Sequence, residues 1–522
     1  MTKRLLALLA TVFVCACGND DAAPVQAIPQ PQWGRARADS SNSGVGATTV
    51  TNTGLFMTSP LPLNAGAIRT TPAIGLDGTV FVATETGVIV ALDPNLNELW
   101  RFRGFGPTRC SPSVDAFNNL YIGTDAGLVG ALNSLGEPLW LTPRALGSAV
   151  VGSPLLLIDA VFNVTQALFV GTEDGRVVSL GGTDGQIRWQ FTTGGAIRSS
   201  LMFTGLTLYV PSADQFLYSL TQQGTAAFPK TPLGPVLDGF SAAPSLFLQN
   251  VVQTGLTDGR VRGFTTAATA PLWEVDVGAP VDTSAAQFTR IVTQRFQNGD
   301  GTFNQVDVAV TDFFVADSAG KGWLLSTQTG APGTRCIGGP DDQQPCRTDE
   351  DCIVPNQPPG TCQPIFACNG GENAGLICRR DTGAENCPGG RCESIATCAG
   401  GETPGRECSN DAACTGGICD LSLFTTSDPV VASPVTTAEG TIFVTTSSSG
   451  GGGILYAVEP PSQREPLESA CLVSPPSVAP RFCRFAFETA GGMQASPSIA
   501  ISGTLYFGDD LGFLYSLGNG PS

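Results

Sequence analysis

Histidine does not occur anywhere in the 522 residues of this chain. Its absence excludes Ser-His-Asp and Cys-His catalysis, histidine-ligated metal sites and haem attachment through a Cys-x-x-Cys-His motif. Charged residues are also scarce, at 14% of the chain, and 27 Lys and Arg face 45 Asp and Glu. At a net charge of −18 there is no basic stripe that could neutralise phosphates, so we expect no nucleic-acid partner.

The apolar stretch at the amino terminus is short. Residues 5–16 are largely apolar and follow two basic residues, and twelve residues are too few to span a bilayer as a helix. We interpret residues 1–16 as an export signal. Ala16-Cys17 and the residues before it resemble a bacterial lipoprotein signal-peptidase site, which implies a lipid on Cys17. A plain secretory signal is the alternative.

The residues after the signal bear on the location of the protein. Residues 17–47 are predicted to form a flexible tether and lead-in. By resemblance to enteric sorting rules, Gly18 does not signal retention at the inner membrane. We therefore expect an extracytoplasmic protein at the outer membrane or cell surface, attached to the membrane only through its lipid anchor.

Glycine and proline, in contrast, are abundant, with 64 and 38 residues, and they recur at regular intervals. Residues 71–100 indicate four short strands separated by turn signals such as Asp77-Gly78. The same unit recurs down the chain, and the first six units start 40 to 46 residues apart. Each unit opens with a pair of residues, in order Thr71-Pro72, Ser111-Pro112, Ser153-Pro154, Ser199-Ser200, Ala243-Pro244, Thr283-Ser284, Ser433-Pro434 and Ser496-Pro497.

A period of about 40 residues with four strands is typical of a β-propeller blade. We predict an all-β chain with an eight-bladed propeller of four-stranded antiparallel blades. Seven blades is the alternative, because the sixth unit must be reassembled between Ser326 and Thr425. The last unit lacks an outer strand, and residues 56–69 match the segment that follows Trp189. We therefore expect the amino-terminal strand to complete the last blade and close the ring.

The predicted outer strands of four units carry a tryptophan, at Trp100, Trp140, Trp189 and Trp273. Together with Trp33 in the lead-in, these units resemble the quinoprotein (PQQ-type) propeller repeat, over residues 32–518 apart from the insertions. If this chain is a dehydrogenase of that family, the resemblance implies that PQQ binds over the central channel. It also implies a disulfide of adjacent cysteines, a stacking tryptophan and a bound calcium ion. This chain has no adjacent cysteines, and no acidic and amide set matches the calcium ligands. We assign no catalytic, cofactor-binding or metal residue, and we expect the tryptophans to pack between blades.

Residues 336–419 interrupt the sixth unit with twelve cysteines and few apolar residues. In an exported chain, three modules of four cysteines predict six disulfides, two per module, with the pairing inside each module left open. Zinc held by four cysteines per module is the alternative. The modules contain Cys336, Cys346, Cys352 and Cys362; Cys368, Cys378, Cys387 and Cys392; and Cys398, Cys408, Cys414 and Cys419.

Three further cysteines lie in the propeller units. Cys471 and Cys483 flank a Pro- and Ser-rich loop in the seventh unit, and we predict a disulfide that staples it. Cys110 is left over, and we expect it to be buried as a small hydrophobe.

One stretch has some features of a calcium loop. Residues 297–307 carry oxygen-bearing side chains at alternate positions. The acidic first position and the terminal Glu of that pattern are missing, so we interpret the stretch as a hairpin turn through Asn298-Gly299.

The sequence thus predicts a signal at 1–16, a tether and lead-in at 17–47, propeller at 48–335 and 420–522, and a cysteine-rich insertion at 336–419. We expect a non-catalytic binding or scaffold protein of the cell envelope, with an envelope protein or glycan as partner and no cofactor. A PQQ-dependent dehydrogenase that uses PQQ and calcium is one alternative. The other follows from a resemblance to the lipoprotein propeller that assists outer-membrane protein assembly.

Overall fold

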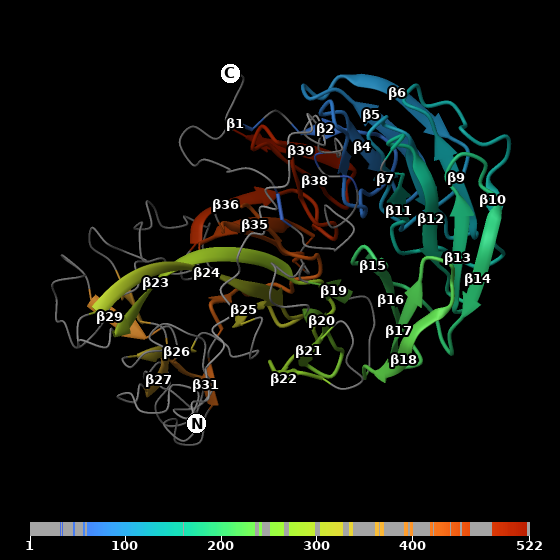
Figure 1. Cartoon of the computed structure of the whole chain (residues 1–522). Helices are drawn as coiled ribbons and strands as arrows, with labels where there is room; N and C mark the ends of the chain where they lie inside the picture. The colour runs from blue at the N-terminus through green and yellow to red at the C-terminus, as the bar shows by residue number, and fades with distance from the viewer. Residues whose placement is uncertain are drawn as a thin grey trace, which may run out of the picture.

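Each repeat of the sequence forms one antiparallel sheet, and eight such sheets stand side by side around a central axis (Figure 1). The prediction of eight blades is confirmed, and the seven-blade alternative is wrong. The computed structural model describes residues 32, 34, 45–46, 56–57, 60–159, 161–234, 240–242, 251–265, 271–297, 303–326, 334–337, 361–364, 366–369, 391–394, 397–399, 418–420, 422–438, 440–448, 451–459 and 483–518.

The first four blades follow one another along the chain without interruption. Their strands are β3 (Ala73–Ile74), β4 (Val80–Ala83), β5 (Val88–Leu92) and β6 (Glu98–Arg103); β7 (Ser113–Val114), β8 (Leu120–Gly123), β9 (Leu128–Leu132) and β10 (Arg144–Ala145); β11 (Leu155–Ile158), β12 (Thr165–Gly171), β13 (Arg176–Gly181) and β14 (Ile187–Thr192); and β15 (Met202–Phe203), β16 (Thr207–Ser212), β17 (Phe216–Thr221) and β18 (Ala226–Pro232).

The last four blades include the interrupted sixth blade and the blade that closes the ring. Their strands are β19 (Phe240–Ala242), β20 (Val251–Gly255), β21 (Arg260–Thr265) and β22 (Trp273–Asp276); β23 (Ala286–Gln297), β24 (Phe303–Ala316), β25 (Lys321–Ser326) and β32 (Phe424–Thr425); β33 (Val435–Thr436), β34 (Ile442–Thr445), β35 (Gly453–Val458) and β36 (Cys483–Thr489); and β37 (Ser498–Ile499), β38 (Leu505–Gly508) and β39 (Phe513–Gly518) with β1 (Phe56–Met57) and β2 (Leu61–Pro62).

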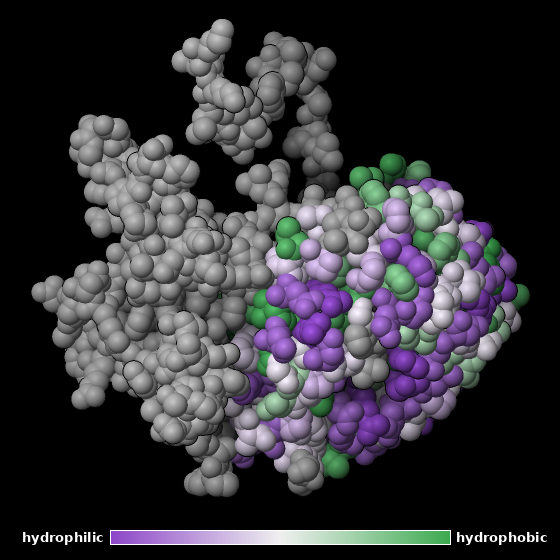
Figure 2. Space-filling model, turned by 90° about the horizontal axis from the view of Figure 1, so that it is seen from below, coloured by the Kyte–Doolittle hydropathy of each residue, from purple (hydrophilic) through white to green (hydrophobic). Residues whose placement is uncertain are grey.

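Hydrophobic burial decreases from the inner to the outer strand of a blade. In the first blade every residue of β4 and β5 is buried, whereas β6 is exposed or half-buried along its length. Continuous apolar runs are expected where neighbouring sheets cover both faces of a strand. The outer strands face solvent, and Figure 2 shows mostly hydrophilic residues on the described surface seen from below, with hydrophobic residues scattered among them.

Neighbouring blades share their cores. Ala73, Phe81 and Ile89 of the first blade belong to the same buried cluster as Leu120 and Ile122 of the second. One blade alone would expose both apolar faces to water, and at about 25 cal/mol per Å² that exposure is strongly unfavourable. Stacking around the ring therefore stabilises every blade through its neighbours.

Three tryptophans join consecutive blades by hydrogen bonds. The indole nitrogen of Trp100 donates to the Ser134 carbonyl (2.9 Å), that of Trp140 to Gly182 (2.8 Å) and that of Trp189 to Gln222 (2.8 Å). Each acceptor lies in the blade that follows in sequence. The predicted packing between blades is confirmed for these three residues.

One detail of that prediction is wrong. Trp140 lies outside β10, between an isolated bridge that pairs Pro138 with Leu132 and the short strand itself. Pro138 and Pro143 flank it, and neither can donate a backbone hydrogen bond to a sheet. The outer edge of the second blade is therefore interrupted at Trp140.

The amino-terminal strands close the ring, as predicted. Phe56 of β1 pairs with Gly518 of β39, and Leu61 of β2 pairs with Leu514 of the same strand. The outer strand of the last blade therefore comes from the opposite end of the chain. This pairing leaves no open sheet edge between the first and last blades.

The sixth blade is assembled across the cysteine-rich insertion. Its third strand β25 pairs with β32, through Gly322 and Phe424, although about 100 residues separate them. The insertion itself contains three two-stranded ladders: β26 (Thr334–Ile337) with β27 (Thr361–Pro364), β28 (Phe366–Asn369) with β29 (Arg391–Ser394), and β30 (Thr397–Ala399) with β31 (Ile418–Asp420).

The register of these ladders brings cysteines opposite one another. Cys336 faces Cys362, Cys368 faces Cys392, and Cys398 faces Cys419 as direct partners across antiparallel strands. In every module these are the first and the fourth cysteine. The other six insertion cysteines lie outside the described residues.

Among the remaining cysteines, Cys483 is held in a disulfide, while Cys471 lies outside the described residues. Cys110 is buried, as predicted, and its thiol also donates to the Gly152 carbonyl (3.4 Å) and accepts from the Gly123 amide (3.3 Å).

The long hairpin of the sixth blade turns where the sequence predicted. Gln297 of β23 pairs with Phe303 of β24, so the chain reverses between them. Residues 298–302 of that turn lie outside the described part of the chain, as do residues 1–16 and Cys17. The part of the chain that is described includes no helix long and apolar enough to cross a membrane.

Candidate functional site

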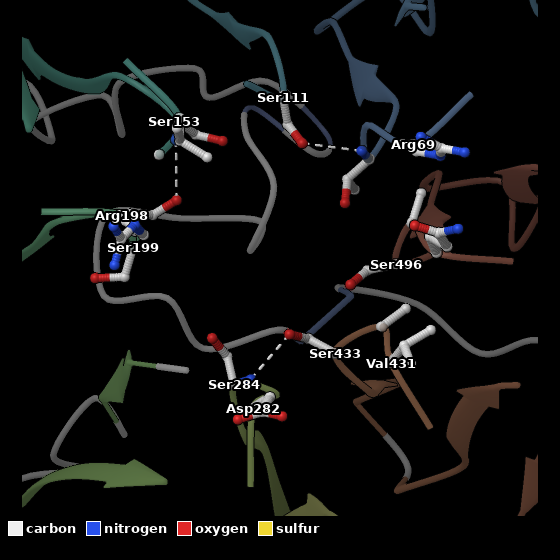
Figure 3. Close-up of a pocket in the computed structure, with 17 residues that line it drawn as sticks. Arg69, Ser111, Ser153, Arg198, Ser199, Asp282, Ser284, Val431, Ser433 and Ser496 are labelled. Atoms are coloured by element: carbon white, nitrogen blue, oxygen red, sulfur yellow. Dashed lines mark hydrogen bonds between the residues drawn. The ribbon is translucent and has the colours of Figure 1, made fainter. Parts of the chain in front are cut away.

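The inner strands of the blades begin around a cavity at one end of the central channel, which we call the channel mouth (Figure 3). The cavity has a volume of about 190 Å³. The described residues that line it come from the segments just before the inner strands of seven blades. They are Arg69, Thr71, Ser111, Val151, Gly152, Ser153, Arg198, Ser199, Ser200, Asp282, Ser284, Val431, Ala432, Ser433, Gln494, Ala495 and Ser496.

Hydroxyl groups of the mouth accept hydrogen bonds from the preceding blade. The Thr71 amide donates to Ser111 Oγ at 2.9 Å, and Figure 3 shows this bond spanning two blades. The Ser153 amide donates to Ser200 Oγ in the same way (3.1 Å), and the Ser284 amide donates to Ser433 Oγ (2.9 Å). Because a buried amide without a partner costs about 1–3 kcal/mol, these hydroxyls have a structural role.

These bonds correct the alignment of two sequence units. In the fourth and sixth units the residue equivalent to Thr71 is Ser200 and Ser284, one position after the predicted Ser199 and Thr283. Neither unit has the proline that marks the other openings, and a run of small residues does not fix a register by itself.

The residue two positions before each opening forms a ring at the mouth whose chemistry differs from blade to blade. In chain order the described members that line the cavity are Arg69, Val151, Arg198, Asp282, Val431 and Gln494. Arg109 occupies the same position in the second unit. The sequence interpretation missed these residues, although aligning the units on Thr71 and its equivalents would have revealed the variation.

Carboxylates fix the arginines of this ring. Arg69 forms ion pairs with Glu85 and Asp510, both at 3.0 Å. Arg198 pairs with Glu173 at 3.3 Å. The groups are partly exposed, so each pair contributes at most about 1 kcal/mol, and their main effect is to orient the guanidinium groups.

A further pair extends this arrangement around the rim of the mouth. Arg109 pairs with Asp125 at 3.0 Å and lies 3.8 Å from the same Glu173 that pairs with Arg198. Glu173 therefore links the arginines of the second and fourth blades. Positive and negative groups alternate along this side of the mouth.

Asp282 is the one acidic side chain among the described lining residues. Its Oδ1 atom is buried and has no hydrogen-bond partner among the described residues. Burial raises the pKa of this carboxyl above its ordinary value. Asp282 is thus the lining group whose hydrogen-bonding capacity is least satisfied, and it would gain most from a donor on a bound molecule.

The described lining does not fit PQQ and calcium as the family resemblance implies them. Trp100, Trp140 and Trp189 bond to neighbouring blades and do not line the cavity. Asp282 is the lone carboxylate of the lining, and no group of three acidic or cysteine side chains among the described residues could hold a metal ion. We therefore assign no residue of the mouth to this cofactor.

Comparison with protein families gives a match over residues 127–329, to the family described as outer membrane protein assembly factor BamB. This segment runs from the third strand of the second blade to the third strand of the sixth. No curated protein matches the sequence.

Several solved structures are similar to this chain. The BamB structure from Moraxella catarrhalis is 12% identical, with a TM-score of 0.49, over 89% of this chain and 99% of that one. The computationally designed Ika8 protein is 10% identical, with a TM-score of 0.46, over 87% and 96%. Quinohemoprotein alcohol dehydrogenase from Comamonas testosteroni is 13% identical, with a TM-score of 0.42, over 95% and 81%. Residues 127–329 thus match a family of PQQ-like propeller proteins, and the described chain has the fold of an eight-bladed β-propeller.

Proposed function

We propose that this protein is an exported, lipid-anchored propeller that acts at the cell envelope as a non-catalytic binding or scaffold protein. The channel mouth is its docking site, and an envelope protein or a glycan is its partner. The anchor is the lipid on Cys17, at the outer membrane or the cell surface.

One observation carries the proposal: three of the hydroxyls that line the mouth accept hydrogen bonds that hold neighbouring blades together. Ser111, Ser200 and Ser433 accept backbone amides of neighbouring blades. A serine nucleophile needs instead a base within hydrogen-bond reach that takes its proton. Rigid, polar and charge-paired walls of this kind suit recognition of another molecule better than chemistry on it.

The family match supports an envelope role. The model that matches residues 127–329 describes an outer membrane protein assembly factor, and the amino-terminal sequence independently predicts export and lipidation. An adaptor that holds other envelope proteins requires a stable surface and no catalytic group.

The anchor is tested by growing cells with an alkyne-labelled fatty acid and comparing the wild-type chain with Cys17→Ser and Cys110→Ser. We expect label and membrane fractionation for the wild type and for Cys110→Ser, and loss of both for Cys17→Ser. Label on Cys17→Ser, or a soluble wild-type chain, would contradict the proposal.

The docking site is tested by photo-cross-linking in cells. p-Benzoylphenylalanine replaces Gln494, which lines the mouth, or Phe228, which lies on outer strand β18 as a matched control. We expect a discrete cross-linked partner from position 494 alone, weakened by Arg198→Ala. Equal products from both positions, or no product from position 494, would contradict a docking site at the mouth.

A further inference from the structure

The two ends of the propeller carry different turns. Because the four strands of a blade alternate in direction, the turns between first and second and between third and fourth strands lie at one end, which we call the turn face. The channel mouth lies at the other end, since its residues precede the inner strands.

Exposed hydrophobic side chains concentrate on the turn face. Val161 is 82% exposed, Phe162 72% and Leu206 83%, and each lies in the turn between the first two strands of its blade. Ten of the fifteen large exposed hydrophobic residues lie between those pairs of strands: Leu76, Phe117, Leu135, Leu141, Val161, Phe162, Val164, Leu206, Leu272 and Ile501. At the mouth end, only Val431 and Leu511 are of this kind among the described residues.

The tips of these turns are held outward by their own hydrogen bonds. The Asp159 carboxylate accepts the backbone amides of Val161 (2.8 Å) and Phe162 (2.9 Å). Asp115 does the same for the Phe117 amide at 2.9 Å. The apolar side chains therefore project from rigid turns and do not fold back onto the blade.

The amino-terminal part of the chain joins the propeller on this same face. Gln32 Nε2 donates to the Leu76 carbonyl (3.3 Å), and Gln32 Oε1 accepts the Ile501 amide (2.9 Å). Leu76 and Ile501 are themselves two of the exposed apolar tips. From Gln32 to Cys17 there are 15 residues, which span at most about 50 Å when extended.

We propose that the turn face lies on a lipid bilayer, with the apolar tips in the headgroup region and the channel mouth pointing away from the membrane. This inference rests on the proposed lipid anchor at Cys17, which is 15 residues before Gln32 in the sequence, and the Gln32 side chain bonds to Leu76 and Ile501 on the turn face. Lipid anchors become stable when a second contact adds to the acyl chain, and exposed aromatic and aliphatic tips provide one.

The charge of the turn face indicates which lipid headgroups it can contact. Asp77 and Asp159 lie in the same turns as Leu76 and Val161, and both accept hydrogen bonds from turn amides. Asp93 does so in another turn of this face. Carboxylates at this depth are repelled by anionic headgroups. The turn face therefore fits a surface of zwitterionic lipids.

The test attaches the chain to vesicles chemically, so that it does not depend on lipidation in the cell. The chain from Cys17 onward is coupled through that thiol to a maleimide phospholipid in phosphatidylcholine vesicles. p-Azidophenylalanine replaces Phe117 or Phe162 on the turn face, or Phe228 on the outer wall as control, and lipid adducts are measured by mass spectrometry.

We expect several-fold more lipid adduct from positions 117 and 162 than from position 228, and less when half of the phosphatidylcholine is replaced by phosphatidylglycerol. Equal yields from the three positions would overturn the membrane contact, and higher yields on anionic vesicles would overturn the zwitterionic assignment. Failure of the fatty-acid label on Cys17 in cells would instead remove the anchor of the proposed function, so the two failures are distinguishable.

Discussion

The indole nitrogen of Trp100 lies 2.9 Å from the carbonyl oxygen of Ser134, across the boundary between the first and second blades. The indole ring also lies against Gly136, where an added Cβ would be 2.6 Å from a ring carbon. The same arrangement recurs at Trp140 over Gly185 and at Trp189 over Gly224. A tryptophan of one blade thus rests on a glycine turn of the next.

This contact predicts a large effect of Gly136→Ala. Gly136 has a φ of 79°, so alanine costs about 1 kcal/mol in the backbone alone, and overpacking against the indole adds about 1–3 kcal/mol. Gly147→Ala is the matched control, since Gly147 has a φ of 77° and nothing within 4 Å of the added Cβ. Denaturant unfolding should show the lower midpoint for Gly136→Ala; equal midpoints would refute the contact.

The hydrogen bonds that mouth hydroxyls accept from the preceding blade predict that Ser111→Ala is destabilising. The substitution leaves the Thr71 amide without its acceptor, at a cost of about 1–3 kcal/mol. Ser496→Ala serves as control, because Ser496 lines the same cavity and accepts no such bond in the described structure. Thermal unfolding should separate the two variants, and identical melting temperatures would show that these hydroxyls do not join the blades.

The pKa of Asp282 predicts a pH-dependent gain from Asp282→Asn. Burial raises the folded-state pKa above the ordinary value of 3.8, so the native state binds protons more tightly than the unfolded state. Stability from this group is therefore complete below pH 3.8 and lost as the pH rises through the folded pKa. Asp282→Asn should raise the unfolding midpoint at neutral pH, and the gain should disappear in acid.

Asp184→Asn provides the control of opposite sign. The Gln186 amide and other donors lower the pKa of Asp184, so its stabilising effect is present at neutral pH and lost as the pH falls. We expect a small loss for Asp184→Asn at neutral pH. A gain in both variants, or a gain for Asp282→Asn that persists in acid, would contradict the assigned environment of Asp282.

The ladders of the insertion predict its disulfide pairing. Residues directly opposite across antiparallel strands have Cα atoms about 4.5–5.5 Å apart, within the range that disulfides span. We therefore expect the bonds Cys336–Cys362, Cys368–Cys392 and Cys398–Cys419, and by elimination one bond between the middle cysteines of each module. Mass spectrometry of unreduced proteolytic peptides measures this, and a Cys336–Cys346 bond would contradict it.

The fold was largely predictable because the same pattern of apolar strands and glycine turns recurs in each of the eight blades. Glycine turns, apolar strands and a tryptophan at a period of about 40 residues define the blade, and residues 56–69 completed the last one. The residues of the mouth were not predictable from one unit. Arg69 and Asp282 occupy equivalent positions in their blades but carry opposite charges. They line the same cavity only because the blades close into a ring.

Short-range ambiguity explains the remaining differences. The openings at Ser200 and Ser284 shift by one residue because neither unit has the marking proline. The outer strand at Trp140 is interrupted by flanking prolines, whose effect on the strand cannot be inferred from the repeat pattern alone. The cysteine pairing depends on strand register, which the spacing of the cysteines does not determine.

The measurement that tests the central claim most directly is calorimetric titration of the lipid-free protein with PQQ and calcium, combined with a dye-linked dehydrogenase assay. A binding propeller in which Ser111, Ser200 and Ser433 of the mouth hold neighbouring blades together should give no heat of PQQ binding and no dye reduction. Tight binding of PQQ with turnover of an alcohol or sugar would contradict the account and would place a catalytic site in the central channel.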